Sequence, residues 1–478
     1  MKCARSITLS GRALAAQRSR LAARQSTAAA AAPRHRHTSS SALSIRTASR
    51  WQAAACLSTT LPPVQSRSYA SSSAPPETAA LRRTPLYDLH IAHGGKMVPF
   101  GGFEMPVQYS SLSVSASHNF TREKASLFDV SHMVQRHFSG PHAAAFLQTI
   151  TPSDVEGLGV HRSTLSTFLW ERTGGIVDDT IITKLGDQLF YVVTNAGCRD
   201  KDDAYLADQL RKFEAETGAA LRHEKLEDWG LVALQGPLSK DVLTEVLADH
   251  EEADLPGLLF GSSIFARVRL QQTGELSEPL LISRGGYTGE DGFEISIPPE
   301  EAVAVTETLL AAAGPERLQF AGLGARDSLR LEAGMCLYGH DLDDTTTPVE
   351  AALSWIIPKS RRSPDAGYHG AAAIAEQLTP KTKGGKGVER RRVGLTVTGA
   401  PAREGAEIVD GDGEKIGVIT SGCPSPTLGK NIAMGYIKDG FHKAGTEVGV
   451  VVRGKQRAAT VTKMPFVPTK YWKGTAPA

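Results

Sequence analysis

The stretch Gly174-Gly-Ile-Val-Asp-Asp-Thr-Ile-Ile-Thr183 predicts a buried strand that opens a hairpin, with two adjacent acids where apolar side chains are expected. Side chains alternate between the two faces of a strand, so Asp179 shares a face with Val177 and Ile181, while Asp178 shares the opposite face. At most one of the two acids can therefore point into a given pocket. Because acids are rarely buried unless they are paired, the alternative is that both cap the strand end or lie in a hydrated turn.

A second hairpin of the same kind is predicted further along the chain. Residues 176–184 and 189–194 are expected to pair around Gly186-Asp187, and residues 280–283 and 293–297 around a glycine-rich turn. Apolar residues at helical spacing predict helices at 141–150, 199–217 and 323–333. Together these elements indicate a pseudo-duplicated α+β body over residues 81–357.

The sequence pattern changes after residue 357. Residues 358–392 are charged and interrupted by Gly and Pro, which is typical of a linker. Beyond them, short apolar runs separated by turn residues predict a small all-β barrel or jelly roll over residues 393–472, with strands at 393–397, 416–420, 432–437, 448–452 and 458–461. Residues 410–414 lack the full spacing of a calcium-binding loop and are expected to form a hairpin turn.

The N-terminal residues have the composition of a mitochondrial transit peptide. Eleven of the 53 basic residues and none of the 51 acidic residues precede Glu77, among many Ala and Ser residues. We expect a transit peptide at 1–69, cut after Tyr69, and a disordered linker at 70–80; the alternative is a basic tail that stays on the protein. From Glu77 onward, 42 basic residues face 51 acidic residues, a net charge of −9.

This composition excludes several classes of function. A net negative charge does not favour nucleic-acid binding, and no run of eighteen apolar residues could span a membrane. The cysteines beyond the leader are too far apart in sequence for a zinc site or a disulfide framework. The motifs of serine hydrolases, P-loop proteins and zinc proteases are absent, as is a complete dinucleotide-binding fingerprint. His132 and His137 are expected to be structural.

An ordered series of motifs resembles the aminomethyltransferase, or T-protein, family of the glycine cleavage system. The resemblance extends from Leu81 to Trp472. It rests on the opening decapeptide, on the segments at 81–97, 194–198, 233–237 and 463–469, and on Ser126-Leu-Phe-Asp-Val-Ser-His-Met133, Gly286-Tyr-Thr-Gly-Glu-Asp-Gly292, Ala325-Arg-Asp-Ser-Leu-Arg-Leu-Glu-Ala-Gly334 and Thr420-Ser-Gly-Cys-Pro-Ser-Pro426.

The resemblance implies a three-domain cloverleaf, with two α+β folate-binding subdomains, a C-terminal β-barrel and tetrahydrofolate in a central channel. It also implies a reaction in the mitochondrial matrix. An aminomethyl group on the dihydrolipoyl arm of the H-protein reacts with tetrahydrofolate, releasing ammonia and forming 5,10-methylenetetrahydrofolate. The partners are the lipoylated H-protein and, in the complex, the P- and L-proteins. No metal, flavin or nicotinamide is required.

The resemblance also implies roles for individual residues. The family's catalytic acid falls on Asp179, and its pterin-binding carboxylate falls on Glu294, which can accept from an amino-amide edge in bidentate fashion. Further folate contacts fall on Asn195, Tyr287, Arg326 and Tyr471.

Each of these contact residues has a structural alternative. Asn195 could be a turn residue, and Arg326 could be an ion-pair partner of Glu332 or Asp327 on a helix surface. Tyr471 could be a packing residue near the chain end. The glycines of the 286–292 turn are expected to be scaffold, because glycine supplies positive φ with or without a ligand.

Two other functions share this fold. A folate-dependent demethylating dehydrogenase needs an N-terminal flavin domain, for which the residues before Leu81 offer neither the length nor a glycine fingerprint. A non-catalytic folate-binding protein of the iron–sulfur maintenance type carries a Lys-Gly-Cys-Tyr-x-Gly-Gln-type motif that is missing from this chain. The basic run at 381–392 could meet an acidic H-protein, although such runs are usually solvated linkers.

Overall fold

The computed structural model describes residues 80–248 and 253–474. The predicted transit peptide at 1–69 and residues 70–79 of the predicted linker lie outside these ranges. Within the described ranges, no helix is long and apolar enough to cross a bilayer. The first elements of the described residues are helix α2 (Tyr87–Ala92) and a two-stranded hairpin of β1 (Gly95–Phe100) and β2 (Phe103–Tyr109). Helix α3 (Val114–Glu123) follows them.

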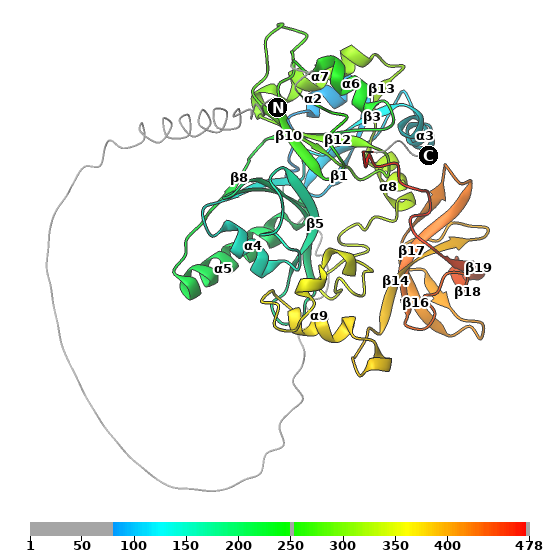
Figure 1. Ribbon diagram of the computed structural model, residues 1–478. Coiled ribbons are helices and arrows are strands. Elements are labelled where there is room, and N and C mark those ends of the chain that lie inside the picture. Colours follow the sequence, from blue (N-terminus) through cyan, green and yellow to red (C-terminus); the bar gives the residue numbers. More distant parts are fainter. Residues whose placement is uncertain (1–79, 249–252, 475–478) are drawn as a thin grey trace, which may run out of the picture. The chain divides into compact units, whose positions relative to one another are not determined.

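An eleven-stranded mixed sheet forms the centre of the N-terminal region (Figure 1). Its strand order is β13-β3-β9-β12-β11-β10-β5-β6-β7-β4-β8. The strands in chain order are β3 (Ala125–Asp129), β4 (Val134–Ser139), β5 (Arg162–Leu169), β6 (Ile176–Gly186), β7 (Leu189–Thr194), β8 (Arg222–Lys225), β9 (Gly230–Gln235), β10 (Ser262–Ala266), β11 (Leu280–Arg284), β12 (Gly292–Ile297) and β13 (Leu318–Phe320).

The sheet consists of two halves with the same internal order. One half runs β5-β6-β7-β4 and the other runs β10-β11-β12-β9, and they meet at a single residue pair, Ser262 opposite Arg162. The predicted hairpins are β6–β7 and β11–β12, both antiparallel. Corresponding loops even share a turn, because Asp154 accepts from the amide of Gly157 as Asp254 does from that of Gly257. The repeated order supports the predicted duplication.

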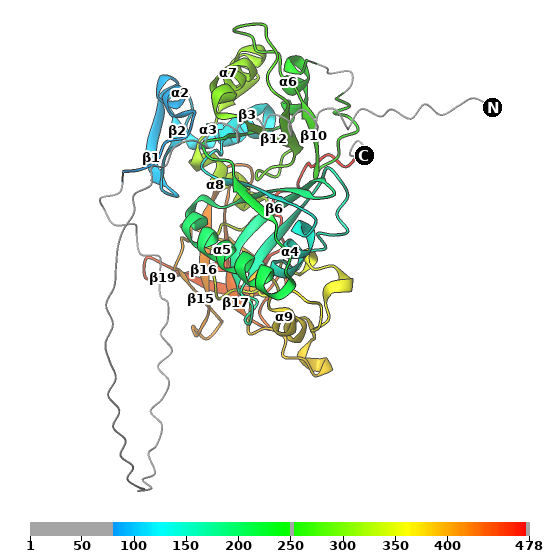
Figure 2. The ribbon, with the colours of Figure 1, turned by 90° about the vertical axis from the view of Figure 1, so that its left-hand side faces the viewer.

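Helices cover the outer face of each half. Phe190 and Val192 of β7 pack in one apolar cluster with residues of α4 (Ala143–Ile150) and α5 (Arg199–Thr217), which Figure 2 shows on one face of this half. In the other half, β9 and β12 pack against α6 (Ser239–Val246) and α7 (Ala302–Ala313). The predicted helix at 199–217 is confirmed and ends at Gly218 with a φ of 68°. The helix predicted at 141–150 begins two residues later.

The inner faces of both halves share a different cluster. Tyr191 and Val193 of β7, Ala233 of β9 and Leu281 of β11 pack there together with α8 (Leu323–Glu332). Because strand side chains alternate, the residues between the outward-facing ones on each strand must point to this cluster. The folate-contact candidates on β12 and α8 therefore lie on the inner side of the sheet.

The C-terminal residues form a closed six-stranded barrel, as predicted. Its order is β14-β17-β16-β15-β18-β19, around an apolar core of its own. The strands are β14 (Arg390–Val397), β15 (Glu407–Val409), β16 (Lys415–Ser425), β17 (Lys430–Lys438), β18 (Glu447–Val452) and β19 (Lys455–Thr462). Residues 410–414 form the predicted turn between β15 and β16, with Asp410 N donating to Glu414 O at 3.0 Å.

The segment from 358 to 392 differs from the predicted linker, because it is ordered and partly internal. It contains α9 (Ala371–Leu378) and three-residue 3-10 helices at Lys359–Arg361 and Lys381–Lys383, and a further 3-10 turn, Ser354–Ile356, precedes it. Ile374 packs with Leu169 and Ile176 in a cluster that also contains Leu342. Arg392 is buried and donates to the carbonyl oxygens of Ala351 and Gly334. The run at 381–392 is thus not simply a free basic surface.

Candidate active site

The strand that carries the two acids is irregular at the acids themselves. Asp178 lies opposite Phe168 of β5, but Ile176 lies opposite the next residue, Leu169, so the register shifts past Val177. Val177 consequently packs in the same outer cluster as Ile182, and Ile181 is 37% exposed. The expectation that Val177 lies on the same face as Asp179 is therefore wrong, because the bulge breaks the alternation at Val177. Ile181 remains on the face of Asp179, as predicted, but it is exposed and does not bury that face.

Asn195 holds both acids in place. This residue follows β7 and begins the short 3-10 helix Ala196–Cys198. Its backbone N–H donates to Asp178 Oδ2 at 2.8 Å, and its side-chain Nδ2 donates to Asp178 Oδ1 at 2.9 Å and to Asp179 Oδ1 at 2.8 Å. With Nδ2 directed at the acids, the amide oxygen of Asn195 points away from them as an acceptor. Asn195 is therefore more than a turn residue.

The two acids differ in burial and titrate unusually. Asp178 is fully buried, whereas Asp179 is half-buried. Burial, followed by the neighbouring charge of Asp178, raises the pKa of Asp179 to about 7, although the hydrogen bond from Asn195 acts in the opposite direction. Burial also raises the pKa of Asp178. Asp179 can thus change its protonation state near neutral pH.

Tyr287, Arg326 and Glu294 form a second group on the inner side of the sheet. Tyr287 donates its hydroxyl hydrogen to the carbonyl oxygen of Cys336, and the Arg326 guanidinium lies 4.8 Å from the Tyr287 ring centre. Burial raises the pKa of Glu294, which the charge of Arg326 opposes. Asp179 acts electrostatically on Tyr287, which connects this group with the two acids.

One buried polar atom of this group has no protein partner in the part of the chain that the structure describes. Within the described residues, the buried Nη1 of Arg326 has no hydrogen-bond partner. The predicted alternative for Arg326, an ion pair with Glu332 or Asp327, is wrong. Asp327 instead pairs with Arg330 at 2.8 Å and Glu332 with Arg122 at 2.7 Å. Because buried polar groups are normally satisfied, Arg326 Nη1 is available to an acceptor on a bound ligand.

Tyr471 has other neighbours than the residues of these two groups. Its ring stacks on Phe260 with centroids 4.1 Å apart, and its hydroxyl has no hydrogen-bond partner within the described residues. Burial raises its pKa to about 12, and its charged neighbours are Arg122 and Glu290. The next residue back, Lys470, donates its backbone N–H to Gly289 O at 2.8 Å, so the C-terminal segment lies against the glycine-rich turn.

One glycine of that turn is sterically required. Gly286 has a φ of 155°, and a Cβ at this position would overlap the side chain of Gln235. This observation agrees with the predicted scaffold role. The turn is held from outside by Arg122, which donates to Thr288 O at 2.8 Å and pairs with Glu290 at 3.0 Å. The sequence offered no signal for this role of Arg122.

A residue that the sequence analysis missed is Asp202, in the first turn of α5. Its carboxyl is fully buried and adjoins that of Asp178. A signal existed in the sequence, because Asp202 stands four and eight residues before Leu206 and Leu210, on the apolar stripe of the helix. A carboxylate in such a stripe is unusual and indicates a specific partner.

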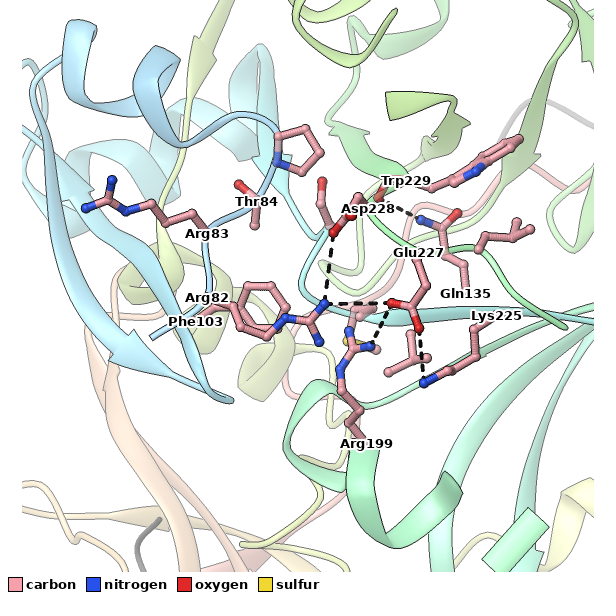
Figure 3. Close-up of a pocket in the computed structure, with 15 residues that line it drawn as sticks. Arg82, Arg83, Thr84, Phe103, Gln135, Arg199, Lys225, Glu227, Asp228 and Trp229 are labelled. Carbon is pink, nitrogen blue, oxygen red and sulfur yellow. Dashed lines mark hydrogen bonds and ion pairs between the residues drawn. The ribbon is translucent and has the colours of Figure 1, made fainter. Parts of the chain in front are cut away.

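A separate pocket lies at the surface near the start of α5, and none of the six predicted site residues lines it (Figure 3). The guanidiniums of Arg82 and Arg199 lie 5.0 and 5.6 Å from the Phe103 ring centre. Both approach Glu227 loosely, at 3.7 and 3.8 Å. Because these pairs are solvated and long, they indicate a weak surface network, and we assign no chemistry to it.

Comparison with known proteins places this arrangement in a family. Residues 86–361 match the family described as the GCVT N-terminal domain, and residues 390–468 match the glycine cleavage T-protein C-terminal barrel domain. The chain is 49% identical over 396 residues to the probable mitochondrial aminomethyltransferase of Schizosaccharomyces pombe, covering 83% of this chain and 95% of that protein. It is 46% identical over 393 residues to the mitochondrial aminomethyltransferase of Pisum sativum, covering 82% and 91%.

Among solved structures, the glycine cleavage system aminomethyltransferase T from Bartonella henselae is similar with a TM-score of 0.71 and 40% identity, covering 82% of this chain and 100% of that one. The predicted α+β region with a C-terminal barrel is confirmed by this likeness and by the strand order. The predicted mitochondrial location agrees with the mitochondrial relatives. This chain therefore belongs to the glycine cleavage T-protein family, the aminomethyltransferases.

Proposed function

We propose that this aminomethyltransferase uses Asp179 to transfer the one-carbon unit from the aminomethyl-dihydrolipoyl arm of an H-protein to tetrahydrofolate. The observation that carries the proposal is the half-buried Asp179 carboxylate, held by Asn195 and with a pKa raised to about 7. In the reaction, the methylene carbon leaves sulfur and ammonia and becomes bonded to two folate nitrogens. The two hydrogens lost from these nitrogens go to the thiol and to ammonia.

Asp179 accepts a hydrogen bond from a folate amine and stabilises the positive charge that develops as this nitrogen takes up carbon. The carboxylate does this best in its ionised form. Asn195, whose amide oxygen points away from the acids, orients the same heterocycle by accepting from an N–H group. Positioning of the two reacting groups contributes further to the rate, because the entropy of bringing them together in the reactive orientation is lost on binding and not in the chemical step.

Glu294 binds the pterin end of the folate in this proposal. Its carboxylate lies on the inner side of the sheet, and within the described residues it makes no hydrogen bond to a protein donor. An amino-amide edge supplies two parallel N–H donors for such an acceptor. Tyr287 and Arg326 flank this site, and Arg326 brings a buried guanidinium N–H that needs an acceptor. Tyr471, which follows Lys470 beside the glycine-rich turn, is the remaining proposed folate contact.

The proposal extends to partners and processing. The lipoylated H-protein delivers the carbon unit in the mitochondrial matrix, within a complex that includes the P- and L-proteins. The transit peptide ends at Tyr69, with the folate-binding region at 81–357 and the barrel at 393–472. N-terminal sequencing of the protein from mitochondria tests the cleavage point, and a chain that begins at Met1 contradicts it.

The decisive assay combines the purified protein with aminomethylated H-protein and measures ammonia. We expect ammonia release that depends on added tetrahydrofolate, with methylenetetrahydrofolate formed in equal amount. A demethylating dehydrogenase would instead require an N-methyl substrate and an electron acceptor, and a folate-binding protein without catalysis would bind folate but release nothing. Ammonia release that is equal with and without tetrahydrofolate refutes the proposal.

A further inference from the structure

Behind the proposed catalytic acid lies a second carboxyl pair that the reaction does not touch. Asp178 on β6 and Asp202 on α5 are both fully buried, and their carboxyl groups adjoin each other. Neither oxygen of Asp202 has a hydrogen-bond partner of good geometry within the described residues, although the Thr194 hydroxyl lies beside it. A buried carboxyl without a hydrogen-bond partner, in contact with a second buried carboxyl, needs an explanation, because ionised carboxylates only accept hydrogen bonds.

Two negative charges in contact inside a protein repel strongly. In that situation one carboxyl keeps its proton and donates it to the other, which remains ionised. Asp202 is the member with free hydrogen-bonding capacity, since Asp178 already accepts two hydrogen bonds from Asn195 at 2.8 and 2.9 Å.

We infer that Asp202 and Asp178 share one proton, and that this pair is the positioning element that holds the Asn195 amide and thereby orients the Asp179 carboxylate. The direct chain of contacts is short. Asn195 Nδ2 donates to Asp178 Oδ1 and to Asp179 Oδ1, so an Asp178 that keeps its charge also fixes the geometry at Asp179. The part of this inference that concerns Asp179 rests on the proposed function, but the shared proton does not.

Other charged and titratable groups around the three acids do not replace this arrangement. Arg136 on β4 is the nearest cation to Asp202, but it pairs with Asp203 at 2.6 Å. Lys201 donates to Asp344 at 3.1 Å rather than to the pair. Asp341 adds negative charge on the side of Asp179, and the remaining groups nearby are the neutral side chains of Cys198, Tyr287, Cys336 and Tyr338.

The shared proton has a direct spectroscopic test. Infrared spectra at about pH 8.5 distinguish a protonated carboxylic acid from carboxylates. This pH lies above the pKa of about 7 for Asp179 and below that of about 10 for Asp202. We expect a protonated-acid band in the wild-type protein and in Asp200→Asn, a matched control on the exposed side of α5. The contribution of Asp202 should be missing from Asp202→Asn, whereas a contribution from Glu294, whose pKa is also raised, is common to all three proteins and cancels in the difference spectrum. The absence of the band from the wild-type protein, or an equal band in Asp202→Asn, overturns the inference.

The positioning role is tested by the dependence of turnover on pH. Asp202→Leu removes the donor that Asp202 offers to Asp178 and leaves only the two hydrogen bonds from Asn195, so Asp178 takes up the proton itself and loosens its hold on Asn195. We expect turnover to fall about 10- to 100-fold, as for misplaced catalytic groups. The acid limb of the pH profile should also move to lower pH, because the negative charge of Asp178, which disfavours ionisation of Asp179, is lost. Asp202→Asn still donates a hydrogen bond to Asp178. Its acid limb should therefore lie at the same pH as that of the wild type, and its turnover should be close to that of the wild type.

An Asp202→Leu protein whose turnover and acid limb both match the wild type contradicts the positioning role. If this variant does not fold, as judged by thermal melting, the infrared comparison of the wild-type protein with Asp202→Asn decides whether the two acids share a proton, and thus whether the positioning pair exists. If Asp179→Asn retains full activity, the proposed role of Asp179 fails, whereas the infrared band still confirms or refutes the shared proton. The two failures are therefore distinguishable.

Discussion

The two halves of the large sheet share a strand order, but the corresponding strands β6 and β11 carry buried charged groups with different hydrogen-bond partners. In the first half, β6 carries Asp178 and Asp179, and no cation within the described residues pairs with either acid; the donors come from Asn195. In the second half, β11 ends at the buried Arg284, which pairs with Asp291 at 2.5 Å. Its other nitrogen donates to the carbonyl oxygens of Leu255 and Leu258 at 2.7 and 2.8 Å.

This difference separates a charge that stabilises the fold from a carboxyl group that can titrate. Arg284 is compensated by a carboxylate and two carbonyls, so its charge stabilises the turn between β11 and β12 and cannot easily change. The acids of β6 are held by neutral donors, so the pKa of Asp179 is free to rise towards neutrality. Corresponding strands of the duplicated framework thus carry a titratable group on β6 and a compensated charge on β11.

The largest effect is expected at Asp179. Asp179→Asn keeps the shape of the side chain but removes the charge, and we expect turnover to fall about 10²–10⁴-fold. The matched variant is Asp178→Asn, next to it on β6, whose loss should be at least about tenfold smaller because Asp178 acts through Asn195. Steady-state ammonia release measures both. Equal losses from the two substitutions would remove the distinction between them.

The next effect is on stability in the second half. Arg284→Met leaves Asp291 and two carbonyls without their donor, and we expect the free energy of unfolding to fall by about 3–5 kcal/mol. Turnover of the folded protein should change little. The control is Arg317→Met, which breaks an exposed pair with Glu245 and should destabilise the protein much less, because the pair is solvated. Denaturant unfolding compares them, and equal costs would mean that burial does not govern these pairs.

A smaller effect is expected on folate affinity. Glu294→Gln replaces one acceptor oxygen of the proposed pterin site by a donor, and we expect the folate dissociation constant to rise about 10- to 100-fold, as for a lost hydrogen bond to a charged group. Glu300→Gln, exposed just beyond the same strand, is the control. Calorimetry measures the affinity directly. Unchanged binding in Glu294→Gln would remove the pterin contact while leaving the proposal for Asp179 intact.

The smallest effect is the dependence of turnover on pH. The pKa of Asp179 is raised to about 7, so the ionised, active form is lost as the pH falls through that value. Turnover should be constant above about pH 8 and fall about tenfold for each pH unit well below 7. The residual activity of Asp179→Asn should lack this limb. A wild-type profile that stays flat from pH 8 down to pH 5.5 contradicts the raised pKa.

Much of the fold followed from local patterns. The hairpin turn at Gly186-Asp187, the helix α5 with its glycine stop and the turn at 410–414 depend on residues adjacent in sequence, and all are present. The helix α9 was not predicted, because its apolar face is defined by the packing of Ile374 against Leu169 and Ile176, which are distant in the sequence. Similarly, the bulge at Val177 depends on pairing with β5, which strand periodicity alone does not contain.

The sequence by itself determined the element types, the barrel and the family, because periodicity, turn chemistry and ordered motifs are local properties. It also marked Asp179 through the resemblance. Only the tertiary structure decided that Asn195 bridges the two acids, that Arg326 has no ion-pair partner on its helix and that Asp202 lies behind Asp178. The physical reason is that burial and the choice of donors set the charge of a carboxyl, and both depend on segments distant in the chain.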